Sequence, residues 1–134
     1  MKVELNLTIA RKWFDMIVSG IKHEEYRDCE NKQVQRAYLK ACNDRWWQEC
    51  DPIVIFRNGY TMKSRAAAVR ISGYDLRGRW DVKHPEWGEP RRRRSHIVVE
   101  LGQLVGVGPY GELKRMIAER NGKRAGKESE VKNG

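Results

Sequence analysis

The sequence predicts an α+β domain, because stretches with the periodicity of strands and of helices follow one another in mixed order. Apolar and polar residues alternate over residues 2–9, which is typical of a strand with one buried face. Residues 10–19 then place apolar side chains three and four positions apart, which predicts a helix with one apolar face. With 134 residues the chain fits one domain, which we expect to span residues 1–121.

The middle of the chain continues the same mixture. Residues 34–50 have helical periodicity, and Asp51-Pro52 should end that helix because the residue before a proline avoids helical geometry. Short apolar runs at residues 53–56 and 66–72 predict two buried strands. The residues that should end these strands are Asn58-Gly59 and Gly73.

The C-terminal third begins with the last strand that the sequence predicts, at residues 96–101. The strand-breaking residues that follow it are Gly106, Gly108 and Pro109. Residues 110–120 carry apolar side chains on one face and predict a short helix. Residues 122–134 are charged and have almost nothing to bury, so we expect them to form a disordered tail.

The densest group of chemically capable side chains is the stretch G-I-K-H-E-E-Y-R at residues 20–27. Its glycine can end the preceding helix, since glycine adopts the left-handed conformation without a Cβ penalty. The rest of the stretch is expected to be a strand, in which Glu25 and Arg27 share one side and can pair. Lys22 joins them only if it lies in the turn before the strand or if a bulge redirects it.

The charge of the chain favours a polyanionic partner. The formal net charge is +9, and the five tryptophans offer rings on which bases can stack, so we expect RNA or a nucleotide as ligand. Residues 77–96 alone hold seven basic and three acidic side chains. The residues of this loop expected to contact the ligand are Trp87, Arg91, Arg92 and Arg93. The alternative is a solvated loop that only keeps the protein in solution.

Several other classes of protein do not fit the sequence. It has no apolar run near the roughly 18 residues that a membrane span needs, so we expect no membrane partner and no signal segment. Three irregularly spaced cysteines, Cys29, Cys42 and Cys50, predict reduced thiols and a cytoplasmic protein. No two cysteines have the C-x-x-C spacing, so we expect no metal site, and the sequence implies no cofactor.

The pattern G-x-K-x-x-E-x-R, formed by residues 20–27, resembles the signature of the ASCH domain, a PUA-like family associated with RNA. Residues 56–60, and residues 86–89 with the later run 96–104, look like ASCH proteins often seen in phage-type genomes. These segments occur in the family's order and cover roughly the first hundred residues. The resemblance implies a small PUA-like β-barrel with two or three helices packed at its rim.

The function that this resemblance implies is binding of RNA or a nucleotide in a cationic cleft. The cleft should be centred on Lys22, Glu25 and Arg27. Three further residues are candidates to line it, two as walls for a base and one as a reader of a base edge: Tyr26, Tyr60 and Asn58.

Two alternatives remain open. In the first, the protein is a small hydrolase in which Lys22 is the general base, Glu25 relays the proton and Arg27 holds an anionic oxygen. The family lysine is often given such a role, in amidohydrolases acting on N4-acylated cytidines and in ribonucleases. That amidohydrolase branch tends to carry a threonine where this chain has Glu25. In the second alternative, a phage-type accessory protein binds a host protein through its tryptophan-rich loop, with no nucleic acid involved. Separately, the motif residues could have a structural role alone, with Glu25 and Arg27 forming a salt bridge that holds the fold.

Overall fold

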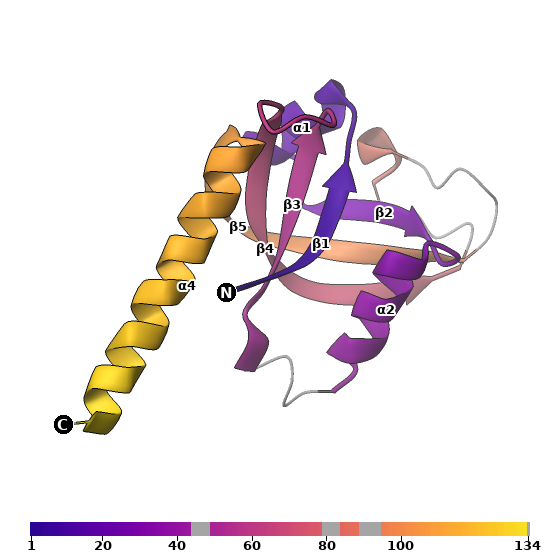
Figure 1. Ribbon diagram of the computed structural model, residues 1–134. Coiled ribbons are helices and arrows are strands. Elements are labelled where there is room, and N and C mark those ends of the chain that lie inside the picture. The colour runs from indigo at the N-terminus through magenta and orange to yellow at the C-terminus, as the bar shows by residue number, and fades with distance from the viewer. Residues whose placement is uncertain (44–48, 79–83, 89–94, 134) are drawn as a thin grey trace.

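The computed structural model describes residues 1–43, 49–78, 84–88 and 95–133, and it describes side chains as far as residue 122 (Figure 1). The elements follow one another in an α+β order, as the sequence predicts. They are β1 (Lys2–Thr8), α1 (Arg11–Val18), β2 (Glu24–Asp28), α2 (Lys32–Ala41), β3 (Pro52–Asn58), β4 (Arg65–Arg77), the 3-10 turn η1 (Pro85–Trp87), β5 (His96–Pro109) and α4 (Tyr110–Asn133).

The five strands form one mixed sheet in the order β1-β3-β4-β5-β2. β1 runs parallel to β3, and the other neighbouring pairs are antiparallel. β1 and β2 are the two edge strands and do not pair with each other in the described part of the chain. The sheet is therefore open, and the closed barrel expected from the family resemblance is not confirmed.

The sheet buries both of its faces. On one face, Val54 and Phe56 of β3 belong to the main core, which also holds the buried side chains of α1 and α2. On the other face, the alternate residues Ile53 and Ile55 pack with α4. Figure 1 shows the result: α4 lies along one side of the sheet, α1 lies over one end of it, and α2 lies on the side away from α4.

Strands β4 and β5 are longer than the sequence predicts. In each of them, a side chain from another element occupies the space beside a glycine that was expected to end the strand. Gly73 was expected to close β4, yet the strand continues to Arg77. A Cβ at Gly73 would lie 2.5 Å from Glu100 Oε2, so the bare glycine leaves room for that carboxylate from β5. Gly106 was expected to break the chain but lies within β5, where a Cβ would lie 2.8 Å from the side chain of Met116 in α4.

The helices also differ from prediction at their ends. The helix expected over residues 34–50 ends at Ala41, where the N–H groups of Cys42 and Asn43 close the last turn by bonding to preceding carbonyls. The last helix was expected to end near residue 120, whereas α4 extends from Tyr110 to Asn133. Lysine, arginine and glutamate, which are frequent in this stretch, are good helix formers. The domain boundary at residue 121 and the disordered tail from residue 122 stay predictions.

Candidate functional site

The link between α1 and β2 places the lysine of the motif. Gly20 has a φ of +82°, a left-handed conformation that ends α1 without the strain that a side chain would cause. The Lys22 N–H then donates to the carbonyl of Met16 at 3.0 Å, which folds the chain back on the helix. Lys22 therefore lies in the turn before β2, where strand alternation does not apply. This is one of the two arrangements in which the sequence allowed it to meet Glu25.

The three charged motif side chains do meet. Lys22 Nζ lies 3.8 Å from Glu25 Oε2, and Arg27 Nε lies 3.8 Å from Glu25 Oε1. Glu25 lies opposite Val99 of β5 and therefore faces the same side of the sheet as the main core. Arg27 also donates from Nη2 to the carbonyl oxygen of Thr8 at 3.2 Å, which joins β2 to the end of β1. We call Lys22, Glu25 and Arg27 the motif cluster.

Burial sets the electrostatics of the motif cluster. Lys22 is 2% exposed and Glu25 is 7% exposed. Burial lowers the pKa of Lys22, and the charge of Arg27 lowers it further, whereas Glu25 opposes both effects. Burial raises the pKa of Glu25, against the opposing charges of Lys22 and Arg27. An amine and a carboxyl group whose pKa values move toward each other can exchange a proton more readily than the same groups in water.

The motif cluster also holds buried polar atoms without a hydrogen-bond partner. Among the described residues, Glu25 Oε2 and Arg27 Nε accept or donate no hydrogen bond. The Lys22 amine, in contrast, donates to the carbonyl oxygen of Trp87, and it lies 5.1 Å from the ring of Trp13. The cluster thus combines an acceptor atom and a donor atom that have ion-pair partners at 3.8 Å but no hydrogen bond, beside an amine that a backbone carbonyl already binds.

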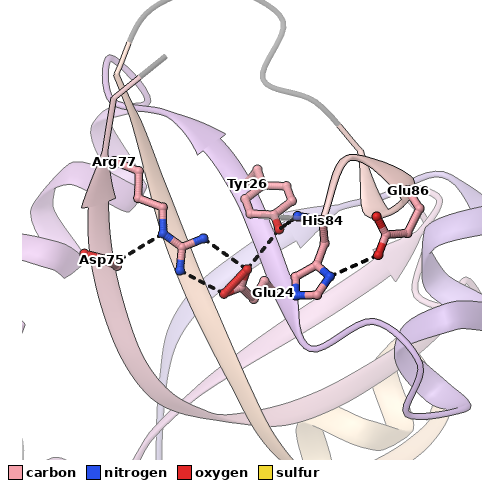
Figure 2. A network of polar contacts seen from close by, with 6 residues as sticks. All are labelled: Glu24, Tyr26, Asp75, Arg77, His84 and Glu86. Atoms are coloured by element: carbon pink, nitrogen blue, oxygen red, sulfur yellow. Dashed lines mark hydrogen bonds and ion pairs between the residues drawn. The ribbon is translucent and has the colours of Figure 1, made fainter. Parts of the chain in front are cut away.

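A second polar network lies on the other face of β2 (Figure 2). The Arg77 guanidinium makes two parallel hydrogen bonds to Glu24, at 3.1 and 3.0 Å. Its Nε donates to Asp75 at 2.9 Å, and the Tyr26 hydroxyl donates to Glu24 at 2.9 Å. The backbone N–H of His84 donates to the same hydroxyl at 3.2 Å, which joins the segment of η1 to the sheet.

Glu24 and Arg77 each stabilise the charged form of the other. Burial alone would raise the pKa of Glu24, but hydrogen bonds from Arg77 and Tyr26 outweigh it, and the pKa is lowered. The hydrogen bonds to Glu24 raise the pKa of Arg77. The pKa of Tyr26 is raised, first by burial and then by its bond to Glu24. Sequence reasoning missed this pair because it placed Arg77 in a loop, whereas Arg77 is the last residue of β4.

Glu24 and Glu25 are expected to give the stability of the fold opposite dependences on pH. The folded-state pKa of Glu24 lies below its unfolded value, so its contribution is present above the unfolded pKa and is lost as pH falls through the folded pKa. The folded-state pKa of Glu25 lies above its unfolded value, so its contribution is full at low pH and is lost as pH rises through the folded pKa.

The measurement is the free energy of unfolding in guanidinium chloride from about pH 3 to about pH 8, for the wild type and two variants. In Glu24→Gln, the free energy of unfolding should fall less steeply than in the wild type as pH is lowered into the acid range. In Glu25→Gln, it should fall less steeply than in the wild type as pH rises from the acid range toward neutral. The same change of slope in both variants would contradict these opposite shifts.

The other residues expected at the site are spread over the molecule. Tyr26 points to the face of β2 that carries the Glu24 network, although Lys22 Nζ lies 5.6 Å from its ring. Asn58 donates from its side chain to the carbonyl of Ile9 at 3.0 Å and so holds the link between β1 and α1. Tyr60 is 84% exposed in the loop between β3 and β4, and no contact among the described residues joins it to Lys22.

The basic loop is described only around η1. The expected ligand contacts Arg91, Arg92 and Arg93 lie outside the described residues. Trp87 ends η1 and is 6% exposed, with the ring of His84 stacked on it at 3.8 Å. Its indole is therefore part of the folded body here, rather than a surface on which a base could stack.

Further features bear on the classes of ligand. Within residues 1–43, 49–78, 84–88 and 95–133, no group of three or more His, Cys, Asp or Glu side chains is arranged to hold a metal ion. Among the described helices, none is both long and apolar enough to cross a membrane. No protein family, curated protein or solved structure matches this chain.

Proposed function

We propose that this protein is an RNA- or nucleotide-binding domain of the ASCH type and that the motif cluster is its ligand site. The observation that carries the proposal is the convergence of Lys22, Glu25 and Arg27 with Glu25 Oε2 and Arg27 Nε left without hydrogen-bond partners among the described residues. Buried polar atoms without partners are rare in native proteins, and a bound ligand is one of the few arrangements that satisfies them.

The two atoms without a hydrogen bond indicate which groups a ligand must provide. A carboxylate oxygen accepts a hydrogen bond, so Glu25 Oε2 calls for an N–H or O–H group. Arg27 Nε donates and calls for an oxygen or a ring nitrogen. The edge of a nucleobase presents donors and acceptors side by side, and the net charge of +9 favours the phosphates attached to it.

The closed PUA-like barrel is part of the same proposal. The bond from Arg27 Nη2 to the carbonyl of Thr8 supports it, because this bond connects the two edge strands β2 and β1. In such a barrel the motif cluster lies where the two edges approach each other. A ligand bound there would contact both ends of the sheet.

A second candidate function is hydrolysis of a modified nucleoside or of RNA, and one observation favours it. Burial lowers the pKa of Lys22, so a larger fraction of its amine is neutral near pH 7 than in an exposed lysine. A neutral amine can act as a general base on water or on a ribose hydroxyl, with Glu25 3.8 Å away to exchange the proton.

The test compares the wild type, Lys22→Ala and Lys22→Arg with short single-stranded RNAs and acylated nucleosides, following binding and product in the same samples. We expect wild-type RNA binding that weakens steeply with salt, since each phosphate contact releases counterions. Lys22→Ala should weaken binding by about tenfold or more, the usual cost of losing a charged hydrogen bond. Lys22→Arg should retain binding, because it keeps the charge.

A matched control is Lys12→Ala, which removes an exposed lysine stacked on the neighbouring Trp13 ring. An equal loss of binding in this variant would assign the effect to general surface charge. Turnover that disappears in Lys22→Arg would replace the binding proposal by the hydrolase, since arginine does not release its proton at working pH. Neither binding nor product would leave recognition of a host protein as the function.

A further inference from the structure

The amine of Lys22 already has a partner in the folded chain. Its Nζ donates to the backbone carbonyl oxygen of Trp87, the last residue of η1. With 2% of its surface exposed, Lys22 is closed off from solvent although it lies at an edge of the sheet. The amine has more than one N–H to donate, so the Trp87 carbonyl does not exhaust its hydrogen-bonding capacity. Because Lys22 is buried, however, a ligand oxygen can reach the amine only if the residues that cover it move.

Aromatic contacts hold η1 in this position. The Trp87 indole is stacked on His84 at 3.8 Å and meets the ring of His23 edge-on at 4.3 Å. It also packs with Tyr26 and Val98 in a small cluster separate from the main core. Figure 2 shows that the hydroxyl of Tyr26 and the backbone of His84 approach each other on the same side of β2.

The geometry of the turn directs its last carbonyl at the lysine. The N–H groups of Trp87 and Gly88 bond back to His84 and Pro85, at 2.9 and 3.2 Å, and so close the turn. Gly88 then has a φ of +120°, a conformation that residues with a side chain rarely adopt.

We propose that η1 is an intramolecular cap on the motif cluster, in which the Trp87 carbonyl occupies the position that an oxygen acceptor of the ligand takes in the complex. The ligand accepts a hydrogen bond from Lys22 through an oxygen of a phosphate or carbonyl group. This oxygen displaces the Trp87 carbonyl, and η1 moves away from Lys22. The identity of the ligand rests on the function proposed above, whereas the occlusion of Lys22 rests only on the contacts of the free chain. The small cluster that holds η1 consists of few residues, so η1 can move away from β2 without unfolding of the main core.

The test measures acylation of lysines by N-hydroxysuccinimide acetate near neutral pH, with each site followed by mass spectrometry. Only the neutral amine reacts, so the lowered pKa of Lys22 would make it faster than an ordinary lysine if it were accessible. In the wild type we expect Lys22 to react at least tenfold more slowly than the exposed Lys12 of α1. Trp87→Ala should raise the rate at Lys22 by about tenfold or more and leave Lys12 unchanged.

A second opened variant, His84→Ala, removes the ring stacked on Trp87 together with its contacts to His23 and Glu86, and it is the smaller change should Trp87→Ala not fold. The matched control is Tyr38→Ala, which removes an aromatic side chain packed against the main core from α2 and should leave Lys22 protected. Wild-type Lys22 reacting as fast as Lys12 would overturn the cap, as would unchanged protection in a folded His84→Ala.

The same variants separate this inference from the proposed function. If single-stranded RNA is the ligand, His84→Ala should bind it more tightly than the wild type, because less of the protein is in the closed state. If no variant binds RNA, the proposed function fails, and the acylation rates still decide whether η1 covers Lys22. Weaker RNA binding by a folded His84→Ala whose Lys22 is accessible would overturn the cap as an inhibitory contact.

Discussion

Replacing Arg77 with alanine is expected to destabilise the fold by about 3–5 kcal/mol, the usual cost of removing one partner of a buried ion pair. Both Arg77 and Glu24 are buried, and the two hydrogen bonds between them are 3.1 and 3.0 Å long. Without Arg77 the Glu24 carboxylate stays in the protein interior, and among the described residues its remaining side-chain donor is the Tyr26 hydroxyl. The measurement is unfolding in guanidinium chloride at pH 7, with circular dichroism as the signal.

The control for Arg77→Ala is Arg70→Ala, which breaks the ion pair between Arg70 and Asp51. Both of these side chains are partly exposed, so water replaces the lost contact, and we expect a cost below about 1 kcal/mol. The double variant Glu24→Ala/Arg77→Ala should lose less stability than the two single losses together, since no buried Glu24 carboxylate is left without its guanidinium. Equal losses for Arg77→Ala and Arg70→Ala would contradict a buried role for Arg77.

Replacing Phe14 with alanine is expected to cost about 3–5 kcal/mol, because it leaves a cavity where a ring is fully buried. Phe14 fastens α1 to the main core, and α1 leads directly into the turn that carries Lys22. The loss should be read from the same denaturant titration, with an unchanged slope if the unfolded state is unaffected.

The comparison for Phe14→Ala is Leu39→Ala on α2, where the side chain is exposed. Its cost should stay within about 0.5 kcal/mol, as for most surface positions. Similar losses at Phe14 and Leu39 would mean that α1 does not depend on the main core for its position.

Local patterns in the sequence predict those parts of the fold that local physics determines. The α+β class, the first strand and the first helix follow from periodicity, and the pairing of Glu25 with Arg27 follows from alternation along a strand. The structure confirms these predictions. For Lys22 the sequence left two arrangements open, a place in the turn or a bulge in the strand, and the structure has the turn.

The parts that sequence reasoning missed depend on neighbours far along the chain. From its local sequence Gly73 is expected to end a strand. In the structure the side chain of Glu100 from β5 occupies the space beside it, and β4 continues. The end of that longer strand then places Arg77 beside Glu24, a pair that no local spacing indicates. The position of Trp87 over Lys22 likewise joins residues 65 positions apart.

The order of strands in the sheet determines when the motif cluster can form while the chain is being translated. In the part of the chain that the structure describes, β2 pairs with β5 alone, so Glu25 and Arg27 leave the ribosome well before the strand opposite them, which begins at His96. At about 5–20 residues per second, translation of the intervening segment takes several seconds. During that interval Lys22 and Glu25 remain in water, with the proton affinities of an unfolded chain. We therefore expect the lowered pKa of Lys22, which burial causes, to arise only after β5 has paired with β2.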